Sequence, residues 1–178
     1  MRKLSSECKI VQVNKPVMKD STSPIKRSPA LIQFSREHHF GLLLGWKIRD
    51  GIKKNIPTER INAYTIFFFE NELARHFKEE EKDLFVKLPV DDNLRKRAFD
   101  EHTHIYQLIE ELKENKQDKN LLLNFADVLD NHIRFEERIL FNHLQQLLSA
   151  ETLKLLEENH SKRKSDADDK WDDHFWEN

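Results

Sequence analysis

Apolar side chains recur every three or four positions along most of this chain, which is the period of one face of an α-helix. Four long stretches carry the pattern, and a helix is predicted for residues 29–50, 57–88, 92–114 and 121–147. No stretch alternates apolar and polar residues with the period of a strand. Because the connections are short and polar, the sequence predicts an all-α protein, an up-down-up-down antiparallel four-helix bundle.

Local signals mark where helices begin. Ser28 is expected to cap the first helix with its hydroxyl, and Pro29 suits the first helical position. Ser149 is expected to cap a short fifth helix that runs to about Glu158. These signals set the limits of the predicted bundle.

Two glycines lie one turn apart inside the first helix, at Gly41 and Gly45. A glycine within a helix costs about 1 kcal/mol relative to alanine. A close approach by a neighbouring helix is the expected reason for both.

The chain divides into three parts by composition. Residues 1–27 mix Ser, Lys, Pro and Asp without a period and are predicted to form a flexible N-terminal extension. Residues 28–158 are predicted to form the bundle with its short extra helix, and residues 159–178 a polar C-terminal tail. The tail has aromatic residues that either dock on the bundle or bind a protein partner: Trp171, Phe175 and Trp176.

Composition excludes several classes of function. The 30 Lys and Arg residues nearly balance the 32 Asp and Glu residues, so no nucleic-acid binding is expected. No apolar run approaches the roughly 20 residues of a membrane span, and no apolar segment follows the basic N-terminus as in a secretory signal. A single cysteine, Cys8, excludes an internal disulfide and a cysteine metal site. A cytoplasmic protein, monomer or dimer, is therefore expected.

Six polar residues fall in phase with the apolar stripes and are expected to point into the core. They are His38, His76, Glu80, His102, His132 and Glu136. A buried ionised carboxylate without a partner is very costly. One in-phase histidine is typical of an ordinary core residue, whereas six such residues on four helices indicate a shared site.

The sequence writes part of this pattern twice, as HFKEEEKDLFVKL from His76 and HIRFEERILFNHL from His132. In each copy a histidine and a glutamate four residues apart share one helix face. The pairs Glu37-His38 and Glu101-His102 repeat on the other two helices. Two tandem hairpins thus offer four imidazoles and two carboxylates, enough for two metal ions with the carboxylates as bridges.

The segments SREHHFGLL, HFKEEEKDLF, FDEHTHIYQLI and HIRFEERILF resemble the hemerythrin-like family, the His-His-Glu cation-binding bundles. The resemblance spans roughly residues 29–147 and implies a non-haem di-iron site with two Fe ions. By motif position it implies these ligands: His38, His76, Glu80, His102, His132 and Glu136. From the donor types alone, Mn or Zn would also suit the site.

The chain departs from the oxygen-carrying members of that family at two points. Those carriers have a second histidine one turn after the first on the third helix, where this chain has Tyr106. They also end with His-x4-Asp, where this chain has His132-x3-Glu136. The resemblance is therefore to a four-His, two-Glu branch, and simple reversible oxygen carriage is not expected.

Other polar residues near these motifs have more than one interpretation. Glu37 and Glu101 either accept hydrogen bonds from ligating imidazoles or are surface charges, and Glu81 and Glu137 are expected to be surface or supporting residues. His39, next to His38, competes with it as the ligand, although the match to Glu101-His102 favours His38. Tyr106 is a phenolate ligand, a hydrogen-bond donor beside the centre, or a core tyrosine; we favour a supporting role.

Three functions of different classes remain open. The first is a di-iron module that binds or reacts with O2, NO or peroxide in sensing or stress defence. The second is an enzyme, either a peroxide or NO reductase or an iron donor for iron–sulfur cluster repair. The third is an interaction bundle that is metal-free or binds zinc.

Overall fold

The computed structural model describes residues 27–159 and 165–177, and within them the secondary structure is entirely helical. The predicted N-terminal extension and its cysteine lie outside the described residues, apart from Arg27. None of the helices in these described ranges combines the length and apolar character needed to cross a membrane.

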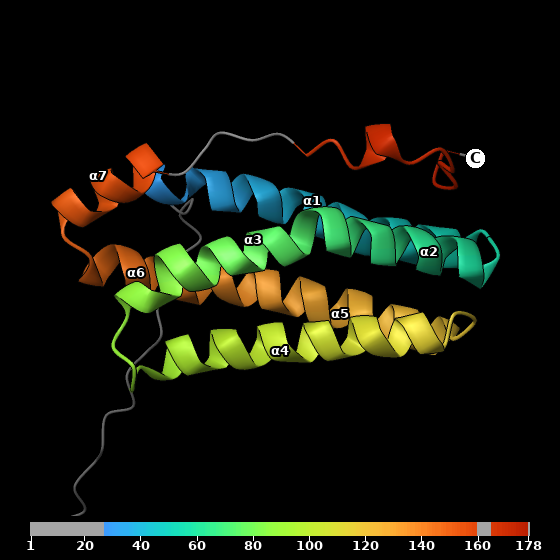
Figure 1. The fold of residues 1–178 in the computed structure, drawn as a ribbon, viewed down its shortest axis with the longest axis horizontal. Helices are drawn as coiled ribbons and strands as arrows, with labels where there is room; N and C mark the ends of the chain where they lie inside the picture. Colours follow the sequence, from blue (N-terminus) through green and yellow to red (C-terminus); the bar gives the residue numbers. More distant parts are fainter. Residues whose placement is uncertain (1–26, 160–164, 178) are drawn as a thin grey trace, which may run out of the picture.

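Four rods of helix lie side by side and antiparallel (Figure 1). The first is α1 (Pro29–Lys53), and the third is α4 (Asn93–Glu114). The second runs through α2 (Thr58–Phe68), η1 (Phe69–Leu73), α3 (Ala74–Glu79), η2 (Glu80–Leu84) and η3 (Phe85–Lys87). The fourth runs through α5 (Lys119–Phe135), η4 (Glu136–Leu140) and α6 (Phe141–Leu147). Contacts of α1 with α2 and α5, and of α4 with α2 and α5, close the rods into a square.

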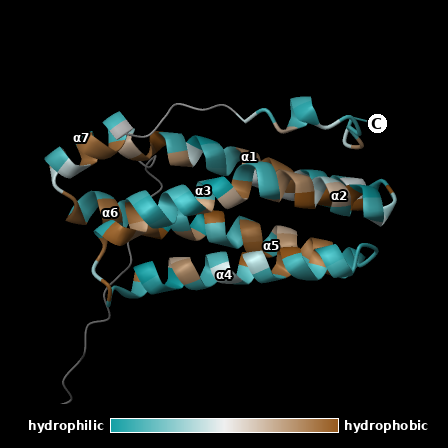
Figure 2. Cartoon of the chain, in the orientation of Figure 1, coloured by the Kyte–Doolittle hydropathy of each residue, from teal (hydrophilic) through white to brown (hydrophobic). Residues whose placement is uncertain are grey.

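Each rod has an apolar side, and Figure 2 shows hydrophilic residues predominating on the outer faces. The buried side chains form two apolar clusters. One cluster includes Ile48, Tyr64 and Leu112, while the other includes Leu31, Leu84 and Leu144. The predicted bundle is confirmed, with its polar core residues between these two apolar layers.

Side-chain caps begin three of the helices. The Asp92 carboxylate accepts hydrogen bonds from the backbone at the start of α4, and Asp118 does the same for α5. Ser149 caps α7 (Ala150–Asn159), as predicted, by accepting from the Thr152 N–H. The expected cap by Ser28 is wrong, since its hydroxyl makes no capping bond and its backbone N–H instead donates to Gln145.

Three π turns interrupt rods that the sequence predicts as continuous helices. In η2 the Phe85 N–H bonds to the Glu80 carbonyl, and in η4 the Phe141 N–H bonds to the Glu136 carbonyl. In an α-helix, a side chain four residues along points about 40° away from the first, measured around the helix axis. A π turn has more residues per turn, so it reduces this rotation. The residues one turn later, Leu84 and Leu140, therefore remain on the buried face.

The two glycines of α1 lie at its contact with α5, as predicted. A Cβ atom on Gly41 would meet the Ile133 Cδ1 atom at 2.8 Å, and one on Gly45 would meet the Asp130 Oδ1 atom at 2.7 Å. Glycine thus allows the close approach of these two helices.

Part of the predicted polar tail packs against the bundle. Residues 165–177 lie along the outer side of α1 and α2, at the end remote from α7 (Figure 1). Phe175 is fully buried and its ring contacts Tyr64, while a Cβ atom on Gly51 would meet that ring at 2.9 Å. The buried Lys47 ammonium contacts the Asp168 carboxylate at 2.6 Å. Of the two alternatives left open for the tail aromatics, the structure shows docking on the bundle.

Candidate metal centre

The six in-phase polar residues meet between the two apolar layers. They come from all four rods, and none is more than 3% exposed: His38, His76, Glu80, His102, His132 and Glu136. The His-x3-Glu spacing on the second and fourth rods sets an imidazole and a carboxylate side by side on the inner face. Each glutamate also begins one of the π turns.

Glu80 links the two halves of the site. Its Oε1 atom lies 3.2 Å from the His38 Nε2 atom and 3.3 Å from the His76 Nε2 atom. Its Oε2 atom lies 3.5 Å from the His102 Nε2 atom. One carboxylate thus reaches histidines of both sequence repeats.

Glu136 has the corresponding place from the opposite side. Its Oε2 atom lies 2.9 Å from the His38 Nε2 atom and 3.4 Å from the His132 Nε2 atom. The Nε2 atoms of His102 and His132 are 3.1 Å apart. These residues form two groups that share Glu80, and within each group the donor atoms all lie within 4.8 Å of one another. One group is His38, His76 and Glu80; the other is Glu80, His102, His132 and Glu136.

A second set of four glutamates holds the outer nitrogens of the histidines. The Nδ1 atoms lie 2.7–2.9 Å from carboxylate oxygens in four pairs: His38–Glu137, His76–Glu37, His102–Glu81 and His132–Glu101. In each pair the glutamate comes from the preceding rod in the cycle, so the contacts close a ring around the bundle. Ligating histidines typically have such a carboxylate on the outer nitrogen, which fixes the ring and its tautomer.

The charge on these outer glutamates follows from their surroundings. Burial by itself would raise the pKa of Glu37, but hydrogen bonds from His76 and Gln33 outweigh it and lower the pKa to about 2. The same opposition of burial and hydrogen bonding leaves the pKa values of Glu101 and Glu137 below their usual range. An ionised carboxylate can only accept a hydrogen bond, so Nδ1 carries a proton in these pairs and Nε2 is the nitrogen that faces the centre.

Several buried atoms at the centre have no hydrogen bond. They include both carboxylate oxygens of Glu80 and of Glu136, and the Nε2 atoms of His38 and His76. Two carboxylates lie in this water-poor interior, and burying their charge without compensation is costly. A cation between them would supply that compensation, so these residues fit a bound metal.

Aromatic rings fix the imidazoles in place. The Phe77 ring stacks on His102 at a centroid distance of 3.9 Å, and the Phe141 ring stacks on His38 at 5.3 Å. Rotation of either imidazole would displace a packed ring. The donor atoms are therefore held in position by packing as well as by hydrogen bonds.

The structure distinguishes the two adjacent histidines of α1. The His38 ring is buried at the centre, whereas His39 is exposed and contacts Phe40. The Tyr106 hydroxyl donates to the Ala74 carbonyl at 3.3 Å, and its ring contacts Phe77. A supporting role for Tyr106 stays a prediction, with Phe77 as the group through which it would act.

Sequence reasoning left the outer glutamates undecided. The doubled Glu-Glu in each repeat was the available signal for Glu81 and Glu137, whose turn away from the inner face indicated surface residues equally well. Their role depends on which rod is the neighbour. Three of the four outer glutamates also contact an arginine: Arg27, Arg75 or Arg97. Only the pair of Arg97 with Glu101, four residues apart on one helix, has a signal in the sequence.

An antiparallel bundle that directs four imidazoles and two carboxylates to one buried point is a cation-binding helical bundle in its class. The chain belongs to the hemerythrin family, as defined by the hemerythrin HHE cation-binding domain, whose model matches residues 46–144, more than half of the chain. Five of the six central residues lie within the match, and His38 precedes it. No significant match was found among curated proteins or among solved structures.

Proposed function

We propose that this chain is a non-haem di-iron protein that binds or reacts with O2, NO or peroxide in sensing or stress defence. The proposed ligands are His38, His76, Glu80, His102, His132 and Glu136. Two bound irons would supply redox chemistry and coordination positions for a small molecule.

The observation that carries the proposal is the convergence of four buried imidazoles and two buried carboxylates from all four rods. Two overlapping donor groups share Glu80, which supports two metal positions rather than one. Oxygen and nitrogen donors without thiolate suit iron, and also Mn or Zn. Family membership supports a cation at this position.

The protein's own residues would orient and enclose the site. The outer glutamates hold each histidine with Nε2 inward, and Phe77 and Phe141 exclude water from two sides. These contacts would keep the donors fixed while a small ligand enters and leaves. Preorganised ligands of this kind need little rearrangement when a metal binds.

The test is elemental analysis of protein expressed in iron-replete medium, with the visible spectrum of the same sample. We expect about two irons per chain and a charge-transfer band that changes when NO is added. The variant His132→Ala should lose iron, whereas His143→Ala on the same rod should retain it, because His143 instead contacts Asp92. Zinc alone, or no metal in the wild type, would contradict the proposal.

A further inference from the structure

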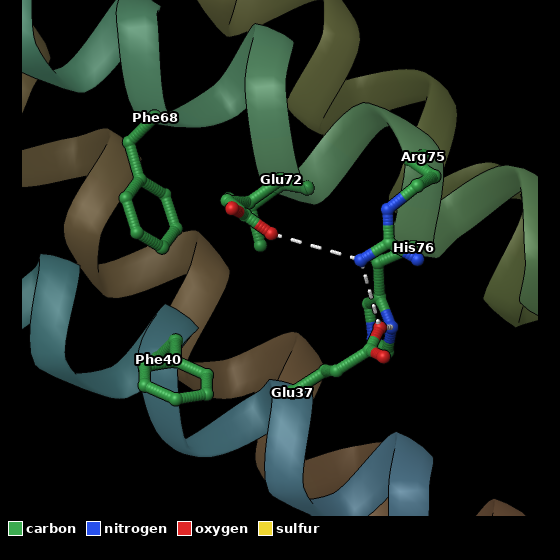
Figure 3. Close-up of a pocket in the computed structure, with 7 residues that line it drawn as sticks. Glu37, Phe40, Phe68, Glu72, Arg75 and His76 are labelled. Atoms are coloured by element: carbon green, nitrogen blue, oxygen red, sulfur yellow. Dashed lines mark hydrogen bonds and ion pairs between the residues drawn. The ribbon is translucent and has the colours of Figure 1, made fainter. Parts of the chain in front are cut away.

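A small pocket lies on the outer side of His76, between α1 and the second rod (Figure 3). Its lining residues are Glu37, Phe40, Phe68, Glu72, Leu73, Arg75 and His76. Its volume is about 10 Å³, close to what one water-sized molecule requires. The pocket ends at the His76 imidazole and at Glu37, which accepts the hydrogen bond from that imidazole.

The π turn η1 forms one wall of the pocket and has no counterpart in the second repeat. Glu72 and Leu73 belong to η1, whereas the corresponding Val128 and Leu129 belong to the regular helix α5. Arg75 likewise corresponds to the exposed Asn131. Each sequence repeat supplies half of the six central residues. The charged pocket residues Glu72 and Arg75 occur only in the repeat that contains His76.

Arg75 lies across the pocket and is held by three carboxylates. Its guanidinium is 2.8 Å from Glu79, but 3.4 Å from Glu37 and 3.6 Å from Glu72. Figure 3 shows the last two contacts: the one with Glu37 joins α1 to the second rod, and the one with Glu72 lies within the second rod. Since the shortest contact is to Glu79, outside the pocket, the side chain can leave the pocket and keep its closest partner.

The lining favours a small uncharged molecule. Glu37 and Glu72 repel anions, Arg75 repels cations, and the volume excludes a hydrated metal ion. The remaining walls are the apolar Phe40, Phe68 and Leu73. We propose that this pocket, gated by Arg75, is the entrance through which an uncharged diatomic molecule reaches the His76 side of the centre; this inference rests on the proposed function.

The first experiment measures whether dissolved O2 enters the pocket, in protein that contains no iron. The full-length chain is loaded with diamagnetic Zn²⁺, its leucine methyl groups are labelled with ¹³C, and relaxation is measured with and without dissolved O2. The Leu73 methyls should show a larger paramagnetic enhancement than those of Leu129, the corresponding residue of the other repeat. Equal enhancements would overturn the proposal.

The second experiment uses a variant that fills the pocket. Phe40→Trp should lower the Leu73 enhancement to the Leu129 level and slow NO association with the ferrous protein about tenfold. The matched control is His104→Trp, at the corresponding exposed position of the other repeat. It should leave both readouts unchanged, and equal slowing by both variants would overturn the proposal.

A third variant keeps the proposal testable if Phe40→Trp does not fold. Arg75→Ala should speed NO association, while Asn131→Ala should not, and no acceleration would contradict a gate at Arg75. The experiments distinguish failure of the di-iron proposal from failure of the entrance proposal. Iron-free protein with an enhanced Leu73 signal would support the entrance and contradict the di-iron function, while iron-loaded protein without that signal would do the reverse.

Discussion

At the scale of single residues, each central histidine is used at both ring nitrogens. The Nε2 atom faces the centre, and the Nδ1 atom donates to a glutamate of a neighbouring rod. For His132 that glutamate is Glu101, at 2.9 Å, and Arg97 holds the same carboxylate at 2.6 Å. Losing such an outer partner typically lowers metal affinity without removing a ligand.

The variant Glu101→Ala is therefore expected to weaken metal binding about 10- to 100-fold while the bundle still folds. Competition with a chelator measures the affinity, and circular dichroism checks the fold. The control is Glu110→Ala on the same helix, because Glu110 is exposed and pairs with Lys113 rather than with a histidine. Equal affinities for the two variants would show that the outer carboxylate is unimportant.

At the scale of elements, the helices depend on caps that the sequence displays and on π turns that it does not. Asp92 accepts hydrogen bonds from the Leu94 and Arg95 N–H groups and also contacts His143 on the fourth rod. One side chain thus begins α4 and ties it to α6. The π turns follow from competition between local helix geometry and core packing, which a local pattern does not record.

Replacing Asp92 by alanine should lower the free energy of unfolding by about 1 kcal/mol, the usual cost of a lost N-cap. Urea denaturation of the metal-free protein gives this difference. The neighbouring exposed Asp91 provides the control, and Asp91→Ala should change stability by less than about 0.5 kcal/mol. If Asp92→Ala does not change the free energy of unfolding, the start of α4 is stabilised by packing and not by this cap.

At the scale of the whole molecule, the polar centre divides the apolar core into two layers. Polar groups buried at 0–3% exposure cost free energy of desolvation, so the metal-free bundle is less stable than its apolar packing alone would allow. Binding of metal to the folded state alone adds stability by mass action. The centre therefore couples metal content to the stability of the fold.

Metal removal is expected to lower the melting temperature. With free metal at 100 times Kd the added stability is about 2.7 kcal/mol. For a chain of this length that corresponds to about 5–10 °C. Calorimetry before and after chelation measures the shift, and identical melting curves would favour the structural interaction bundle.

The docked C-terminal segment is a long-range contact that also stabilises the bundle. Phe175 is fully buried against Tyr64 and Gly51. The variant Phe175→Ala should cost about 3 kcal/mol, as for other buried aromatic residues. Urea denaturation measures this cost, and Glu177→Ala, at an exposed position, is the control. A negligible change would mean that the segment does not dock in solution.

The sequence by itself determined the helical class, the four rods, the cap at Ser149, and the six inward polar residues. Helical period and capping are local, so a few adjacent residues suffice to specify them. The tertiary structure decided the ring of outer glutamates, the burial of His38 and exposure of His39, the π turns, the pocket beside His76 and the docking of Phe175. Each of these depends on which rods become neighbours, and that follows from the packing of the whole chain rather than from any one segment.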